Sequence, residues 1–171
     1  LMNRKHDTKC YLEIIEKLRM VNKNIKISSD FIVGYPEETE KDYEDTINII
    51  KKVGFINSYS FIYSARPGTP ASNKKTNNLE KNKKRLKNLQ NVLENLQINN
   101  NKKYINEFCE VLVENKLKDQ KKYFGRTQFM TPVIFESDNC KNGELIKVKI
   151  ISCNRNNLFG FHKITKNERA A

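Results

Sequence analysis

The residues most suited to chemistry lie where a predicted strand ends and a helix begins. A short apolar run, residues 31–33, is followed by Gly34 and Pro36, and Thr39 then has the residue type of a helix cap. This order indicates a buried strand, a tight turn and a capped helix. Because ligands of α/β sheets bind at the carboxyl ends of the strands, we expect a binding site at residues 34–38.

Asp30 is the acidic residue that precedes this apolar run. A carboxylate in a strand that we expect to be buried needs partners, and ribose hydroxyls would serve. A structural aspartate, bonded to the backbone or to a neighbouring basic group, explains the same residue equally well. Arg66 stands beside the rigid pair Pro67-Gly68 after a second predicted strand. It could meet RNA or a cofactor, although a lone loop arginine is more often solvated.

The first half of the chain alternates helices and strands. Apolar spacing predicts helices over 8–23 and 40–53, and strands over 26–35 and 56–63. This alternation is typical of parallel strands with helical crossovers. Two parallel strands would expose both edges and one face, so this α/β half needs more strands than the chain supplies. We therefore expect the chain to be a piece of a longer protein.

The second half changes to a period of two after a long helix, 79–106. The helix begins with a run of basic residues, for which a solvated face and phosphate contact are equally good explanations. Short strands separated by Gly, Asn and Asp then predict a small antiparallel β-barrel. The predicted strands are 109–114, 131–135, 146–151 and 158–162. The predicted domains are thus 1–106, including the helix, and 107–167.

The composition points to an acidic partner. The 171 residues include 32 Lys and Arg against 20 Asp and Glu, a formal charge of +12, which suits a nucleic acid, although coding bias toward Lys and Asn is an alternative. The four cysteines are scattered, so neither a zinc site nor a redox motif is expected, and no metal is assigned. No signal peptide or apolar run of membrane-spanning length is present, which favours the cytoplasm.

Several motifs together resemble one family, the radical-SAM methylthiotransferases. In the α/β half they are Leu-Met-Asn-Arg-Lys at 1–5, the stretch 29–39, and Tyr-Ser-Ala-Arg-Pro-Gly-Thr-Pro-Ala at 63–71. In the second half, 111–114, 125–127, 148–150 and 158–160 resemble the TRAM domain. The resemblance implies the C-terminal part of a radical-SAM partial TIM-like barrel, followed by an OB-like TRAM barrel. It is greatest to the branch that modifies isopentenyladenosine in tRNA.

The resemblance also implies site residues and cofactors. Arg4 matches an arginine that approaches the methionyl carboxylate of S-adenosylmethionine, a pairing suited to a guanidinium. It assigns Asp30 to the same cofactor and places the backbone of Ser64 near the adenine. The family's CxxxCxxC triad is absent here. The ligands of the [4Fe–4S] clusters would therefore lie outside this chain, in the missing N-terminal part of the same enzyme. This chain alone would be inactive. We expect the whole enzyme to be a monomer.

In the barrel, basic and aromatic residues alternate near position 125, as in small barrels that bind single-stranded RNA. We assign Lys121, Lys122 and Arg126, with Arg66, to a tRNA anticodon stem-loop, and expect Phe124 and Phe159 in the core. The alternative is that all the aromatic residues are core and Arg126 braces a turn. One residue departs from the family pattern: Glu37 replaces a usual glycine. A positive φ there would strain it, but we favour the alternative that the turn tolerates either residue.

Overall fold

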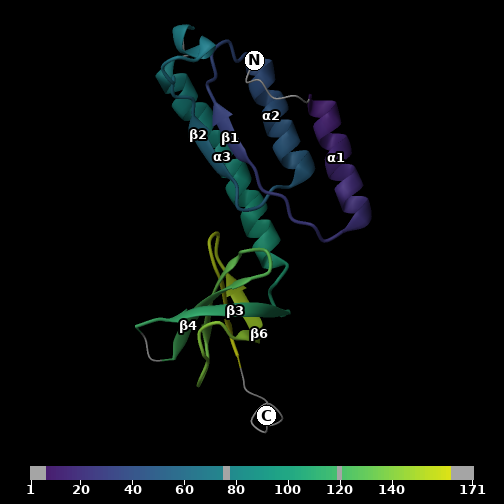
Figure 1. Ribbon diagram of the computed structural model, residues 1–171, viewed down its shortest axis with the longest axis vertical. Coiled ribbons are helices and arrows are strands. Elements are labelled where there is room, and N and C mark those ends of the chain that lie inside the picture. Colours follow the sequence, from purple (N-terminus) through teal and green to yellow (C-terminus); the bar gives the residue numbers. More distant parts are fainter. Residues whose placement is uncertain (1–6, 75–77, 119–120, 163–171) are drawn as a thin grey trace. The chain divides into compact units, whose positions relative to one another are not determined.

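The computed structural model describes residues 7–74, 78–118 and 121–162. The chain forms two compact units, which divide between Leu96 and Gln97. In the described part of the chain, no helix is both long enough and apolar enough to cross a membrane. The two units are described separately below (Figure 1).

The first unit confirms the predicted alternation of helices and parallel strands. Its elements are α1 (Thr8–Val21), β1 (Asp30–Val33), α2 (Glu40–Val53), β2 (Tyr59–Ile62), the 3-10 helix η1 (Pro70–Asn73) and most of α3 (Leu79–Lys102). Strands β1 and β2 pair in parallel, with Asp30 opposite Tyr59 and Val33 opposite Ile62. Both strands are shorter than predicted, since only these four residues of each form the ladder.

Local signals define the helix ends. The Asp7 carboxylate accepts a hydrogen bond of 2.8 Å from the backbone N–H of Cys10 and caps α1. Thr39 and Asp42 form a reciprocal capping box at the start of α2, and Gly54 ends that helix with a left-handed backbone. The bounds of α2 therefore agree with the prediction.

The helices of the first unit pack on one face of the two-stranded sheet. The buried core is formed by Ile15, Val33, Tyr43, Ile47, Ile50, Val53, Phe55, Leu89 and Leu93. The other face of the sheet is exposed: Ile32, Tyr59 and Phe61 are 43%, 68% and 52% accessible. The expectation that β1 is buried is therefore wrong for half of its residues, because no element among the described residues covers their face.

The second unit is a closed barrel of five strands. They are β3 (Phe108–Lys116), β4 (Lys122–Thr127), β5 (Pro132–Glu136), β6 (Leu145–Cys153) and β7 (Leu158–Phe161), in the order β3-β4-β5-β7-β6. The barrel was predicted, but not strand β4. It is also not wholly antiparallel, because β5 and β7 pair in parallel. Closure pairs every edge strand and so removes the open edges of the sheet.

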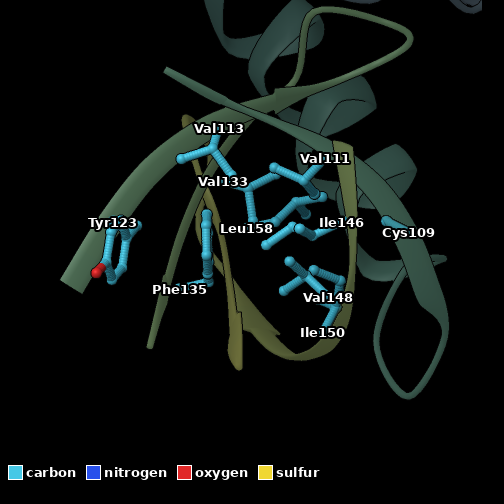
Figure 2. Close-up of a cluster of buried hydrophobic side chains, with 10 residues drawn as sticks. All are labelled: Cys109, Val111, Val113, Tyr123, Val133, Phe135, Ile146, Val148, Ile150 and Leu158. Atoms are coloured by element: carbon cyan, nitrogen blue, oxygen red, sulfur yellow. The ribbon is translucent and has the colours of Figure 1, made fainter. Parts of the chain in front are cut away.

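The barrel interior is filled by side chains from every strand (Figure 2). They alternate along each strand with outward-facing residues, and the rings of Tyr123 and Phe135 stack with centroids 5.7 Å apart. The prediction of Phe124 and Phe159 as core residues is wrong, because both are only half-buried and their neighbours Tyr123 and Leu158 fill the interior. Because side chains alternate between the two faces of a strand, a register shift of one residue moves each side chain to the other face.

Candidate functional site

The first candidate site is the exposed face of the β1–β2 sheet with the rim at its carboxyl end. At this rim, Tyr35 and Tyr63 meet edge to face, with ring centroids 5.1 Å apart. The Tyr63 N–H donates to the carbonyl of Val33 at 2.8 Å, which extends the parallel pairing beyond the strands. The rim thus combines two aromatic rings with backbone groups at the position where α/β sheets bind ligands.

The turn after β1 has an unusual backbone. Gly34 and Glu37 have φ angles of 76° and 70°, both in the left-handed region. The condition for strain at Glu37 is therefore met, since a side chain is disfavoured at such an angle. The Glu37 carboxylate accepts a hydrogen bond of 2.7 Å from the ammonium of Lys74, which raises the pKa of Lys74. Because both side chains are substantially exposed, this pair contributes little stability.

The structure separates the cofactor residues proposed from the sequence. Asp30 lies at the amino end of β1 on the exposed face, whereas Ser64 follows the carboxyl end of β2 and is exposed. At about 3.3 Å per residue, the five-residue step from Tyr59, opposite Asp30, to Ser64 is roughly 16 Å. One extended ligand would be needed to contact both. Arg4 lies outside the described residues.

Arg66 is exposed in the loop beyond Ser64. Its carbonyl accepts hydrogen bonds from the backbone N–H and the hydroxyl of Thr69, at 3.3 and 2.8 Å. These bonds close a turn over residues 66–69 and so fix the backbone from which the Arg66 side chain extends.

The basic residues at the start of α3 do not all lie on one exposed surface, which both sequence-based explanations require. Arg85 is only 4% exposed, and its guanidinium donates to the carboxylates of Glu38 and Glu40 at 2.7 and 2.8 Å. Lys81 also pairs with Glu40, at 2.9 Å, and both cations lower the pKa of Glu40 through hydrogen bonds. Lys83 pairs with Glu80. For Arg85, both predicted roles, solvated residue and phosphate contact, are wrong.

A sequence signal for the burial of Arg85 existed. It precedes the buried Leu89 by four positions, so the two lie on one face of the helix. A basic residue on an apolar face requires buried acidic partners. The sequence alone could not identify Glu38 as the partner, because 47 residues separate it from Arg85.

The second candidate site is the outer surface of the barrel. Arg126 Nε donates to a Glu114 carboxylate oxygen at 2.9 Å, and its guanidinium lies 5.6 Å from the centre of the Phe124 ring. Both charged side chains remain 36% exposed. Lys121 is exposed and Lys122 is half-buried at the start of the same strand. Arg126 thus braces β3 against β4 and still presents a flat cationic surface to solvent.

Sequence reasoning missed a second exposed group on the barrel, across β3 and β6. Phe108 is 67% exposed, and the ammonium of Lys149 lies 4.8 Å from its ring centre. Farther along the same ladder, Leu112 and Leu145 are opposite each other and are 45% and 63% exposed. The outward positions of an alternating strand could have identified them. Aromatic and cationic groups side by side can hold a nucleic-acid base and its phosphate.

The described residues contain no group of three or more His, Cys, Asp or Glu side chains able to hold a metal ion. All four cysteines are free thiols. Burial raises the pKa of the Cys109 thiol to about 11, so it is neutral at physiological pH. A neutral buried thiol is a core side chain rather than a ligand.

Comparison with known proteins places these features in a family. Residues 102–161 match the TRAM domain. The chain is 52% identical over 169 residues to the tRNA-2-methylthio-N(6)-dimethylallyladenosine synthase of Pelagibacter ubique, which covers 99% of the chain. The chain belongs to the methylthiotransferase family. Synthases of the same name from Buchnera aphidicola and from Wolbachia sp. subsp. Brugia malayi are 44% and 40% identical to it, over 94% and 93% of the chain.

The chain spans 37% of the length of each of these three methylthiotransferases. The match confirms the family inferred from the motifs at 29–39 and 63–71. It runs through both units, because it covers nearly the whole chain.

Proposed function

We propose that the chain is the C-terminal part of a radical-SAM methylthiotransferase. The whole protein would add a methylthio group to carbon 2 of isopentenyladenosine beside the anticodon of tRNA. The observation that carries this proposal is the 52% identity, over 99% of the chain, to a protein named for that product. The exposed face of the β1–β2 sheet is consistent with it, because further strands would pair at the edges of the sheet and curve it into a partial barrel with that face inside.

The exposed sheet face suits one side of an adenosyl group. Ile32, Tyr59 and Phe61 offer an apolar surface, and Asp30 lies on the same face with an accessible carboxylate. We assign to Asp30 the acceptance of hydrogen bonds from ribose hydroxyls, and to Ser64 backbone contacts with the adenine. Arg4 would bind the methionyl carboxylate as a two-pronged donor. Asp30, the apolar face and Ser64 would fit an S-adenosylmethionine molecule that lies extended along the sheet, and this cofactor would supply the methyl group and the radical chemistry when bound.

The [4Fe–4S] clusters do not fit the cysteines of this chain, which are far apart in the sequence and include a buried neutral thiol. Their ligands would belong to the missing N-terminal part of the same protein. The contribution of this chain is therefore to bind and orient the cofactor and the RNA. Alone it would bind tRNA without turnover, as a monomer in the cytoplasm.

We assign RNA binding to the barrel, residues 107–167. Lys121, Lys122 and Arg126 would contact the phosphates of the anticodon stem-loop, and Arg66 would contact the RNA or the cofactor from the first unit. The exposed guanidinium of Arg126 over Phe124 favours this role, since stacked cationic and aromatic groups bind unpaired bases.

A chimeric protein tests the function. This chain would replace the matching 37% of the Pelagibacter ubique synthase, and tRNA nucleosides would be analysed by mass spectrometry after reconstitution of the clusters. We expect 2-methylthio-isopentenyladenosine from the chimera and none from the synthase lacking that segment. Isopentenyladenosine without the methylthio group, from a chimera that binds both clusters, would contradict the proposal.

The same assay separates the other candidate functions. Methylthiolated threonylcarbamoyladenosine would assign the chain to another tRNA branch, and a methylthiolated ribosomal protein to a third. If the chimera binds RNA but modifies no substrate, the chain would be an RNA-binding module only.

A further inference from the structure

A buried arginine of the first unit binds the junction between the turn after β1 and helix α2. Arg85 of α3 donates to the Glu38 carboxylate at 2.7 Å and to the carbonyl of Thr39 at 3.1 Å. Its third bond, to Glu40, is described above. All three acceptors lie at the junction of the turn with the first residue of α2, so one guanidinium ties this junction to α3.

Glu38 links Arg85 to the backbone of the turn. The carboxylate oxygen that accepts from Arg85 also accepts from the backbone N–H of Gly34, at 2.9 Å. The Glu38 N–H in turn donates to the carbonyl of Tyr35 at 2.9 Å. Arg85, Glu38 and the left-handed backbone of Gly34 therefore form one continuous hydrogen-bonded chain, which begins in α3 and ends at the last residue before the rim.

Closely packed side chains surround these hydrogen bonds. A Cβ atom at Gly34 would lie 2.3 Å from the side-chain nitrogen of Asn82, which is 3% exposed. On its other side, the Arg85 guanidinium lies 5.0 Å from the centre of the Tyr43 ring, and the Tyr43 hydroxyl donates to the Arg85 carbonyl at 3.0 Å. The cation is thus enclosed by α2 and α3, with its acceptors all on the turn side.

A buried ion pair is weak evidence for stability, because desolvation of the charges offsets their attraction. Its geometry is nevertheless specific, since a guanidinium offers several donors in a fixed plane. The contribution of Arg85 is therefore more easily explained by the conformation that it selects than by the free energy of folding.

We propose that Arg85 and Glu38 position the turn at residues 34–38, and through it the rim of the candidate cofactor site. The part concerning the cofactor rests on the function proposed above, whereas the part concerning the turn does not. Arg85 contacts no ligand in this assignment. It acts through Glu38 on Gly34, whose backbone leads directly to Tyr35 at the rim.

The first test measures the turn itself in the 171-residue chain. Arg85→Lys keeps the charge but replaces the planar donor set by a point charge that cannot span Glu38 and Thr39 in the same way. We expect amide hydrogen exchange at Gly34 to rise about tenfold, with exchange in the middle of α2 unchanged. Lys83→Met is the matched control, because Lys83 pairs with Glu80 on the surface of the same helix.

Glu38→Ala provides a second variant that removes the acceptor and leaves Arg85 in place. It should raise exchange at Gly34 as Arg85→Lys does. Unchanged Gly34 exchange in both variants would overturn the proposal, whatever the function of the protein.

The second test uses the chimeric synthase. Arg85→Lys should raise the KM for S-adenosylmethionine about tenfold and leave kcat within about twofold, as expected for a lost binding geometry. A purely structural role would lower the amount of folded enzyme without changing KM. An unchanged KM would therefore overturn the link to the cofactor. A wild-type chimera without turnover would instead contradict the proposed function, and Gly34 exchange would still decide the role of Arg85.

Discussion

At the scale of single residues, Gly34 is the position where both the backbone and its surroundings exclude a side chain. We predict that Gly34→Ala destabilises the chain by about 2–4 kcal/mol, because it combines left-handed strain with a clash against buried Asn82. Urea denaturation followed by circular dichroism would measure the change in the free energy of unfolding.

The chain offers a matched control for this prediction. Gly68 has a φ angle of 80°, and a Cβ built on it meets nothing within 4 Å. Gly68→Ala should therefore show only the left-handed strain, about 1–2 kcal/mol. The double variant Gly34→Ala with Asn82→Ala should recover part of the loss. Equal losses at Gly34 and Gly68 would show that Asn82 does not restrict the turn.

The buried thiol of Cys109 gives a prediction about pH. Its pKa is raised from 9.0 to about 11 by burial, so the unfolded chain ionises first. The resulting stability is complete below pH 9 and is lost as the pH rises through 11. Between these values, the free energy of unfolding should fall with a slope approaching about 1 kcal/mol per pH unit more in the wild type than in Cys109→Ala.

Thiol labelling provides an independent check of the same residue. Exposed Cys10 should react with a disulfide reagent at pH 8 in the native chain, whereas Cys109 should react only after denaturation. Rapid labelling of Cys109 in the native chain would contradict its burial in the barrel.

At the scale of elements, the capping box of α2 is the best-defined helix start. The Thr39 hydroxyl accepts from the Asp42 N–H at 3.1 Å, and the Asp42 carboxylate accepts from Thr39 at 2.6 and 2.8 Å. These bonds lower the pKa of Asp42, so its contribution is present near neutral pH and is lost as the pH falls below about 4. We predict that Thr39→Ala destabilises the chain by about 1 kcal/mol at pH 7.

The pH dependence distinguishes a cap from a general effect of substitution. The loss caused by Thr39→Ala should shrink toward acid pH, because the Asp42 carboxylate that accepts from the Thr39 hydroxyl becomes protonated as the pH falls. Asp45→Asn removes a carboxylate from the same helix outside the cap and should leave this difference unchanged. Denaturation curves from pH 7 down through the acid range would measure both effects, and a loss that stays constant as Asp42 is protonated would contradict the contribution of its carboxylate.

The predictability of the elements follows from where their signals lie. Helix α2 was predicted to the residue because its cap, its apolar stripe and Gly54 are all local. Strand β4 was missed because its buried positions are Tyr123, Gly125 and Thr127, so its alternation lacks aliphatic residues. Without the register of β4, residue type is the only guide to which aromatic side chains face the core.

Some features of the candidate site could be predicted from the sequence, and others could not. The left-handed backbone at Glu37 could be anticipated from the glycine of the family pattern. The position of Asp30 could not, since the exposure of β1 depends on what covers the sheet. The role of Arg85 depends on Glu38 and Glu40, which are distant in sequence and become neighbours only when α2 and α3 pack.

At the scale of the whole molecule, the 32 Lys and Arg residues are not all available to an acidic partner. Lys74, Lys81, Lys83 and Arg85 all pair with carboxylates. Net charge therefore does not locate an RNA surface, and local position must. The TRAM motifs favour the barrel, as do the contacts of Arg126 with the Phe124 ring and of Lys149 with the exposed Phe108 ring.

Salt dependence tests this assignment in the intact chain. Each phosphate contact on single-stranded RNA contributes about 0.7 to the slope of log K against log salt. If Lys121 and Lys122 each contact a phosphate, the double variant Lys121→Gln with Lys122→Gln should reduce the slope for an anticodon stem-loop by about 1.4. Binding would be measured by fluorescence anisotropy across a series of salt concentrations.

The matched control changes two adjacent lysines by the same chemistry in the first unit. Lys51 and Lys52 are exposed in the last turn of α2, so Lys51→Gln with Lys52→Gln lowers the net charge equally. A general attraction between a basic protein and RNA would respond similarly to both double variants. A specific contact surface on the barrel requires the slope to fall only for the Lys121 and Lys122 variant, and equal slopes in the two variants would contradict that surface.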